Sequence, residues 1–540
     1  MKSRWTAVAS AATAYTFAAI AHAAGIACAD LKNLPLDSTT VTLAQEVSEG
    51  AYNTPPGCTT PGVPGTGCVA NIVPAFCRVA LTVSPAIKIE VWLPKTTWNE
   101  RYRGEGGGGY AGSISYGGLV TGIKAGYATA STDTGHVGGS GAFAFNANGT
   151  LNWGLIEDFA ERSLHELAIK SKAVINAYYG EAPKYSYWNG CSTGGRQGLM
   201  AVQRFPEEYD GLVIAAPAIN WERFIAAELW PQIVMNQELG RAISNAKLNR
   251  VTVDAVAACD GADGVTDGVI NDPRKCNYDP GDARSLCPAG DAKTCLSAAE
   301  ADAVRKIWNG PTDASGKRLW FGLERGASLT GLAGGNVFPP DPTSTILTPF
   351  PIAATHMQWV MQNPAFDWHT MTEESFPSAF RLSQETFNEV IGTDNDNVQA
   401  FRKRGGKMIL WHGEADQLIM TRGTLNYFSR VLTGNGGVKH ADDFARLFLA
   451  PGVGHCGGGN GPNPVGTFEA MVNWVENGVA PDTILARRVA GGVTTERPLC
   501  PYPTTAKYKG SGSTNDAKNF VCINGQPDAA DFKITGPGSN

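Results

Sequence analysis

The segment Gly190-Cys191-Ser192-Thr193-Gly194 decides the fold, because it matches the pattern G-x-S-x-G between a predicted strand and a predicted helix. Residues 184–189 predict the strand, and residues 194–205 can form the helix. A tight turn between these elements exposes the Ser192 hydroxyl, and small neighbours let the backbone bend. Glycine and serine are common in this chain, so the flanking elements make the pattern informative. The segment therefore predicts a nucleophile elbow.

Strands and helices alternate on both sides of this turn. Alternation predicts an α/β fold with a mostly parallel sheet and helices on both faces. Residues 221–400 interrupt it with four cysteines, six tryptophans and no regular pattern. We interpret residues 24–220 and 401–540 as one α/β domain into which a second domain, residues 221–400, is inserted. The predicted strands are 87–93, 127–132, 212–216, 407–412 and 446–450, and the predicted helices are 157–178, 421–432 and 468–476.

The N-terminus and the cysteines indicate export. Lys2 and Arg4 precede an apolar run that ends in Ala21-His22-Ala23, so residues 1–23 are predicted to be a signal peptide. The run is too short for a membrane anchor, the alternative interpretation, which needs about 20 apolar residues. Twelve cysteines without a C-x-x-C pair favour disulfides over a zinc site. We expect a secreted or periplasmic protein.

The charge balance argues against two classes of partner. The net charge is −6 and charged residues make up 17% of the 540 residues. No basic surface is predicted for a nucleic acid or a membrane. A hydrophobic content of 43% is enough for a large core. The sequence does not indicate an oligomeric state.

Two later loops supply a base and an acid for Ser192. One predicted strand runs into His412-Gly413-Glu414-Ala415-Asp416, and the last strong strand runs into a glycine-rich loop that contains His455. The order Ser, Asp, His is the order of a triad in an α/β-hydrolase. We predict Ser192 as nucleophile, His455 as base and Asp416 as the acid that orients it. Glu414 is a rival acid, and His412 is interpreted as structural.

Two cysteines flank this predicted triad: Cys191 precedes Ser192 and Cys456 follows His455. A disulfide between them would place their Cα atoms about 5.5 Å apart and would make Ser192 and His455 neighbours. Other cysteines lie close together in sequence, as 58/68, 259/276, 287/295 and 500/522.

Cys191-Ser192, Asp416 and His455-Cys456 resemble the CS-D-HC motif of the tannase and feruloyl esterase family, which also contains the hydrolase of mono(2-hydroxyethyl) terephthalate. The resemblance extends from Cys28 to Cys522 and implies a secreted α/β-hydrolase with an inserted lid. It implies the disulfides Cys28–Cys77, Cys191–Cys456, Cys259–Cys276, Cys287–Cys295 and Cys500–Cys522, with Cys58–Cys68 as an extra bond.

The insertion also contains an acidic loop, residues 260–269, in which three aspartates alternate with glycines. Such a loop can bind a hard cation or can be a solvated turn. The resemblance implies a structural Ca²⁺ that braces the lid. The implied ligands are the side chains of Asp260, Asp263 and Asp267 and the carbonyls of Val265 and Val269.

An oxyanion hole is expected from two backbone amides. One is Thr193, directly after the nucleophile. The other comes from the run Gly106-Gly107-Gly108, and the resemblance implies Gly107. A plain flexible turn is the alternative interpretation of this run.

The resemblance implies a small aromatic ester as substrate, including esters attached to plant cell-wall polysaccharide. The run Phe366-Asp367-Trp368 is more similar to feruloyl esterases than to the terephthalate hydrolase, where Glu follows the nucleophile in place of Thr193. We therefore predict a serine carboxylic ester hydrolase for hydroxycinnamoyl esters, acting through an acyl-enzyme. Galloyl or terephthaloyl esters are the alternatives, and an inactive calcium-braced binding protein is the alternative of another class. Residues 359–368 either line the substrate pocket or form the core of the lid.

Overall fold

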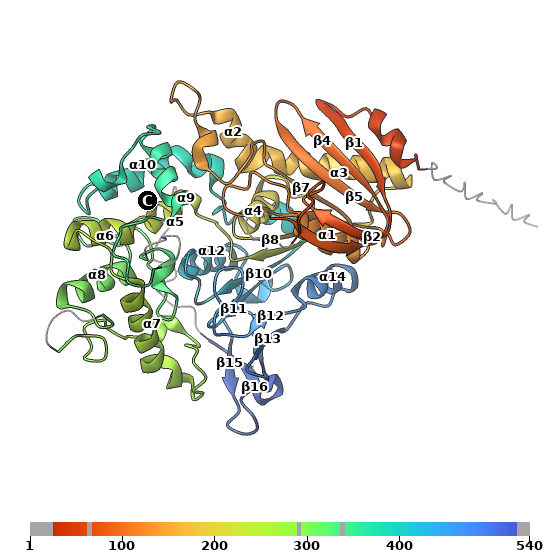
Figure 1. The fold of residues 1–540 in the computed structure, drawn as a ribbon. Coiled ribbons are helices and arrows are strands. Elements are labelled where there is room, and N and C mark those ends of the chain that lie inside the picture. Colours follow the sequence, from red (N-terminus) through yellow and green to blue (C-terminus); the bar gives the residue numbers. More distant parts are fainter. Residues whose placement is uncertain (1–24, 62–66, 289–292, 335–340, 526–540) are drawn as a thin grey trace, which may run out of the picture.

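The computed structural model describes residues 25–61, 67–288, 293–334 and 341–525, so the predicted signal peptide lies outside the described residues. Nine strands of this described part form one sheet (Figure 1). The five neighbouring pairs from β7 to β11 are parallel, and the three pairs from β1 to β7 are antiparallel. In spatial order the strands are β1 (Thr39–Val47), β4 (Phe76–Val83), β5 (Ile87–Pro94), β7 (Ala128–Thr132), β6 (Arg101–Glu105), β8 (Tyr185–Cys191), β9 (Gly211–Ala215), β10 (Lys407–Gly413) and β11 (Ala445–Ala450).

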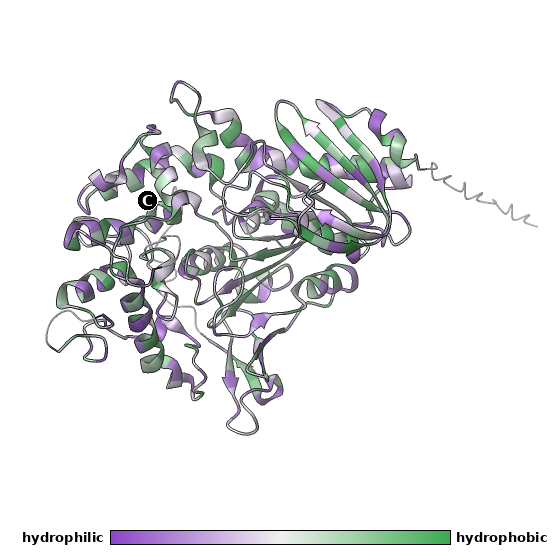
Figure 2. Cartoon of the chain, in the orientation of Figure 1, coloured by the Kyte–Doolittle hydropathy of each residue, from purple (hydrophilic) through white to green (hydrophobic). Residues whose placement is uncertain are grey.

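The central strands are apolar because both faces of the sheet are covered by helices. In β9, Leu212 and Ile214 pack into one core, and Val213 packs into the core on the opposite face. Figure 2 shows β8 to β10 as largely hydrophobic. The sequence thus folds into the predicted α/β-hydrolase architecture. Helices α3 (Ser163–Tyr179), α4 (Thr193–Arg204) and α12 (Thr421–Gly434) cover the first face, and α1 (Tyr116–Lys124) and α14 (Thr467–Asn477) cover the second.

A helical segment separates β9 from β10 in sequence and lies beside one end of the sheet (Figure 1). Its apolar residues form a core of their own, to which Tyr110, Phe159 and Ile419 contribute from outside the segment. The last of its helices, α11, crosses residue 400, the predicted boundary of the insertion. The helices are α5 (Trp221–Glu228), α6 (Trp230–Leu239), α7 (Asn245–Cys259), α8 (Ala298–Asn309), α9 (Pro351–Val360), α10 (Phe376–Ile391) and α11 (Gln399–Lys403).

Smaller elements complete the described chain. A hairpin precedes β4, a three-stranded sheet has one strand before α14 and two after it in sequence, and a hairpin ends the described chain. Among the described residues, no helix is long and apolar enough to span a membrane. The remaining strands and helices are β2 (Gly50–Thr54), β3 (Val69–Val73), β12 (Asn463–Pro464), β13 (Ile484–Ala490), β14 (Val493–Leu499), β15 (Thr505–Tyr508), β16 (Phe520–Ile523), α2 (Trp153–Glu157) and α13 (Val438–Ala441).

All twelve cysteines are paired; five pairs are those that the resemblance implied, and Cys58–Cys68 is the expected extra bond. The bonds are Cys28–Cys77, Cys58–Cys68, Cys191–Cys456, Cys259–Cys276, Cys287–Cys295 and Cys500–Cys522.

Candidate active site

Ser192 lies at the sharp turn between β8 and α4. Its backbone has φ +62° and ψ −123°, a conformation that side chains rarely adopt and that is typical of strained functional turns. Its N–H donates to the carbonyl of Ala215 at 3.0 Å, which holds the turn against β9. A Cβ on Gly190 would lie 2.3 Å from the Gly194 carbonyl oxygen, so this position must be glycine. The backbone therefore presents Ser192 as the pattern G-x-S-x-G predicted.

The Cys191–Cys456 disulfide joins the end of β8 to the loop after β11. Its Cα atoms lie 5.9 Å apart across a sequence separation of 265 residues. Ser192 and His455, the residues beside these cysteines, line the same cavity. The bond thus holds two segments together that are distant in sequence.

Asp416 orients His455. Its Oδ2 lies 2.8 Å from His455 Nδ1, and its Oδ1 accepts backbone N–H groups of Leu418 and Ile419 at 2.8 and 2.9 Å. Because Nδ1 is engaged with the carboxylate, Nε2 of His455 is the nitrogen left to act as a base. The distance between Asp416 and His455 and the burial of Asp416 are those that a catalytic triad requires. The catalytic roles of these residues stay predictions.

His412 is the residue whose contact the sequence interpretation missed. Its Nε2 lies 3.0 Å from the same Oδ2 of Asp416, and its Nδ1 lies 2.8 Å from the hydroxyl of Thr424. Burial by itself raises the pKa of Asp416, but the hydrogen bonds from His412 and His455 outweigh it and hold that pKa well below its usual range. The carboxylate therefore stays charged beside His455. The only sequence signal was that His412 precedes Asp416 by four positions.

Glu414, the rival acid, lies elsewhere. It is buried and lines two cavities, and neither of them contains Ser192 or His455. The structure thus brings Asp416, and not Glu414, to the histidine.

The cavity at Ser192 is lined mainly by apolar side chains. It encloses about 330 Å³, and Ser192 and His455 lie at its wall. Such a pocket can hold an aromatic acyl group next to the nucleophile. The apolar side chains come from the loop after β9, from α5, from the start of α9 with the residue before it, and from the loop after Asp416: Ala218, Trp221, Phe224, Ile225, Phe350, Ile352, Leu418 and Ile419.

The glycine-rich loop after β6 reaches this cavity with different residues from the one that was predicted. The Gly107 N–H donates to Oε1 of Gln197 at 3.0 Å, so this amide is already engaged. Gly108 and Gly109 line the cavity, and the Thr193 hydroxyl donates to the Gly109 carbonyl at 2.5 Å. Gly108 is therefore a second candidate for the expected amide, and the role of Gly107 stays a prediction.

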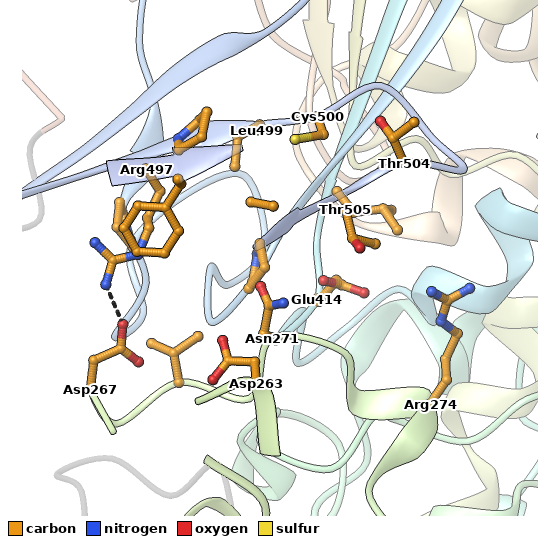
Figure 3. Close-up of a pocket in the computed structure, with 17 residues that line it drawn as sticks. Asp263, Asp267, Asn271, Arg274, Glu414, Arg497, Leu499, Cys500, Thr504 and Thr505 are labelled. Carbon is orange, nitrogen blue, oxygen red and sulfur yellow. Dashed lines mark hydrogen bonds and ion pairs between the residues drawn. The ribbon is translucent and has the colours of Figure 1, made fainter. Parts of the chain in front are cut away.

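The acidic loop of residues 260–269 closes on itself. The carboxylate of Asp260 accepts backbone N–H groups of Asp267 and Gly268 at 3.0 and 2.9 Å. Asp267 pairs with Arg497 at 2.6 Å, as Figure 3 shows. Among the described residues, no group of three or more His, Cys, Asp or Glu side chains is arranged to hold a metal ion.

The chemistry of the same loop nevertheless suits a hard cation. Three carboxylates and two carbonyls, those of Val265 and Val269, are oxygen donors of the kind that Ca²⁺ prefers. Asp263 and Asp267 line one cavity. Burial raises the pKa of Asp263, and the negative charges of Asp267 and Asp260 add to this effect. A cation would offset these charges, but Asp267 would first have to leave Arg497.

The aromatic segment 359–368 contributes its first tryptophan to the core of the helical segment. Trp359 is fully buried, and its indole N–H donates to the Gly141 carbonyl at 2.8 Å. The cavity at Ser192 is lined instead by Trp221, Phe224 and Phe350. The structure thus favours the core interpretation for Trp359.

Comparisons with known proteins agree with this geometry. The sequence model of the family described as "Tannase and feruloyl esterase" matches residues 70–523. A "Probable feruloyl esterase" of Arthroderma benhamiae is 37% identical over 465 residues, which cover 83% of this chain and 85% of that protein. An uncharacterized esterase of Xanthomonas campestris is 34% identical and covers 93% and 92%. The crystal structure of feruloyl esterase B from Aspergillus oryzae superposes with a TM-score of 0.79 at 28% identity and covers 91% of this chain and 98% of that one.

Proposed function

The chain belongs to the tannase and feruloyl esterase family and is a carboxylic ester hydrolase, and on this premise we propose that it hydrolyses feruloyl and related hydroxycinnamoyl esters through an acyl-enzyme on Ser192. One observation carries the proposal: the charged Asp416 holds His455 at the wall of the apolar cavity that also contains Ser192. The substrate class is supported by the relatives named as feruloyl esterases.

The proposed reaction begins when the Ser192 hydroxyl attacks the ester carbonyl carbon. Nε2 of His455 takes the hydroxyl proton, and Asp416 stabilises the resulting imidazolium. The backbone N–H groups of Thr193 and Gly108 hold the negative charge on the carbonyl oxygen. The imidazolium then gives its proton to the leaving alcohol as the ester C–O bond breaks. Water repeats the sequence on the acyl-enzyme, which frees the acid and restores Ser192.

A panel of esters tests the substrate class. The purified mature protein is assayed for kcat/KM on methyl ferulate, methyl gallate, chlorogenate and mono(2-hydroxyethyl) terephthalate. We expect methyl ferulate or chlorogenate to be the best substrate. A kcat/KM for methyl gallate more than about tenfold above that for methyl ferulate would overturn the hydroxycinnamoyl assignment. Such a ratio corresponds to a difference of about 1.4 kcal/mol in activation free energy. No turnover of any ester would favour an inactive binding protein.

Export and attachment of the substrate to a polymer complete the proposal. Six disulfides support an oxidising compartment, so we place the mature protein outside the cytoplasm, secreted or periplasmic. The natural substrate we propose is an aromatic ester attached to plant cell-wall polysaccharide. Feruloylated arabinoxylan fragments test this: release of ferulate from them is the expected result.

We also propose a structural Ca²⁺ at the acidic loop, held by the side chains of Asp260, Asp263 and Asp267 and the carbonyls of Val265 and Val269. When bound, the ion would neutralise the carboxylates and brace the helical segment. Asp263 and Asp267 line one cavity, and Asp260 lies in the same loop, which supports this site. The ion has no part in the acyl transfer.

A further inference from the structure

One ionisable side chain of the cavity at Ser192 has no role in the proposed reaction. Helix α5 presents Trp221, Phe224, Ile225 and Glu228 to this cavity, at spacings that place them on one face of the helix. The first three are apolar, as a pocket for an aromatic ring requires. Glu228 places a carboxyl on the same wall.

Glu228 is buried without a partner. The residue is 1% exposed, and its Oε2 has no hydrogen-bond partner. Among the described residues, no Lys, Arg or His forms an ion pair with it within 4.0 Å. A buried polar atom that lacks a partner costs free energy, so an atom left in this state inside a ligand cavity indicates a partner that arrives with the ligand.

The surroundings favour the neutral form of this carboxyl. Burial raises the pKa of Glu228 well above its usual value, and the negative charge of Asp416 raises it further. A protonated carboxyl has one O–H to donate and oxygens that accept. It can therefore donate a hydrogen bond to a phenolic hydroxyl and also accept one from it.

We infer that Glu228 determines specificity for the acyl group by hydrogen bonding the phenolic hydroxyl of a hydroxycinnamoyl ring. This inference rests on the proposed function and deepens it. We assign Glu228 to the acyl part of the substrate rather than to its alcohol part. An alcohol that is attached to a polymer must reach solvent, whereas Glu228 is buried. Trp221 and Phe224, on the same helical face, supply the apolar wall for the ring.

The test compares two substrates on one enzyme sample. The kcat/KM ratio of methyl p-coumarate to methyl cinnamate is measured for the wild type, Glu228→Leu and Glu228→Gln. These substrates differ only in the phenolic hydroxyl, and the ratio cancels any difference in the amount of active protein. We expect Glu228→Leu to lower the ratio by about 10- to 100-fold, since a site that bonds a substrate hydroxyl discriminates strongly. Glu228→Gln keeps a donor and an acceptor and should retain most of the ratio.

Ile225→Val is the matched control on the same helical face. It changes the shape of the pocket without removing a polar group, so the ratio should stay within about twofold while both rates change together. A wild-type ratio in Glu228→Leu would overturn the inference and leave the proposed function intact. A loss of kcat/KM in Glu228→Leu that is confined to esters with a polar alcohol, such as chlorogenate, would place Glu228 beside the alcohol part of the substrate. That result would also overturn the inference. A wild type that hydrolyses no hydroxycinnamate would overturn the proposed function together with the inference.

Discussion

The sheet and the helical segment between β9 and β10 place their functional residues in different ways. Ser192, Asp416 and His455 follow three strands, β8, β10 and β11, whose carboxyl ends meet at one edge of the sheet. The cavity wall from α5 is placed by packing against residues such as Tyr110 and Phe159, which are distant in sequence. The predicted reacting groups therefore have short sequence signatures, whereas the residues of the cavity wall do not.

The disulfides differ in the same way. Cys191–Cys456 has a sequence separation of 265 residues and joins two loops at the edge of the sheet. The bonds of the helical segment are local, with separations of 17 and 8 residues. The Cys191–Cys456 bond therefore holds together two segments that line the cavity at Ser192, whereas each local bond closes a single loop. The predictions below test this division.

The largest expected effect is that of Ser192→Ala. Removal of the nucleophile should lower kcat on methyl ferulate by about 10⁵- to 10⁶-fold, because members of a triad act as a unit. The melting temperature should stay within a few degrees of the wild-type value, and circular dichroism serves as the control for folding. Activity near that of the wild type would contradict the assignment of the sheet edge as the catalytic region.

Asp416→Asn should lower kcat by about 10⁴-fold, since an amide no longer stabilises the imidazolium or fixes its tautomer. Glu414→Gln is the matched control in the same loop. Because Glu414 does not line the cavity at Ser192, its kcat should change by less than about tenfold. Equal losses in the two variants would show that the loop matters for folding rather than for orienting His455.

The pair Cys191→Ala with Cys456→Ala should lower the free energy of unfolding by about 5 kcal/mol, by chain-entropy reasoning for the long closed loop. It should also lower kcat, because Ser192 and His455 lose their link. Cys259→Ala with Cys276→Ala is the local counterpart, with an expected loss of about 3 kcal/mol and little change in kcat. Urea unfolding and initial rates measure both. An unchanged kcat in the first pair would show that packing of the sheet aligns the two residues unaided.

Removal of Ca²⁺ should have the smallest effect. Ca²⁺ at about 100 times its Kd would stabilise the fold by about 2.7 kcal/mol, so chelation should lower the melting temperature by about 2 to 3 °C in a chain of this length. Asp263→Asn should abolish this response. Asp272→Asn, in the same cysteine-bounded loop but outside the predicted ligands, should keep it. A wild-type melting temperature that is insensitive to both chelator and added Ca²⁺ would remove the metal from the acidic loop.

Local patterns predicted much of the sheet. The predicted strand 407–412 is β10, Lys407–Gly413, and the predicted helix 421–432 lies within α12, because alternation and helical spacing reflect burial on the nearest faces. The predicted helix 157–178 begins instead with a π-helical turn at Asp158–Arg162 before α3. In the helical segment, tryptophans could not be divided between core and pocket, because both environments select the same side chains.

Residue patterns alone predict the α/β architecture and the chain order of Ser192, Asp416 and His455, because each has a short signature of spacing or residue type. The disulfide pairing was expected from the resemblance to a known family. Packing of the folded chain brings His412 to the carboxylate of Asp416, places Gly108 rather than Gly107 at the cavity wall, and leaves Oε2 of Glu228 there without a partner. These are contacts between residues that come together only when the chain packs, and no local pattern records which atoms will meet across the folded interior.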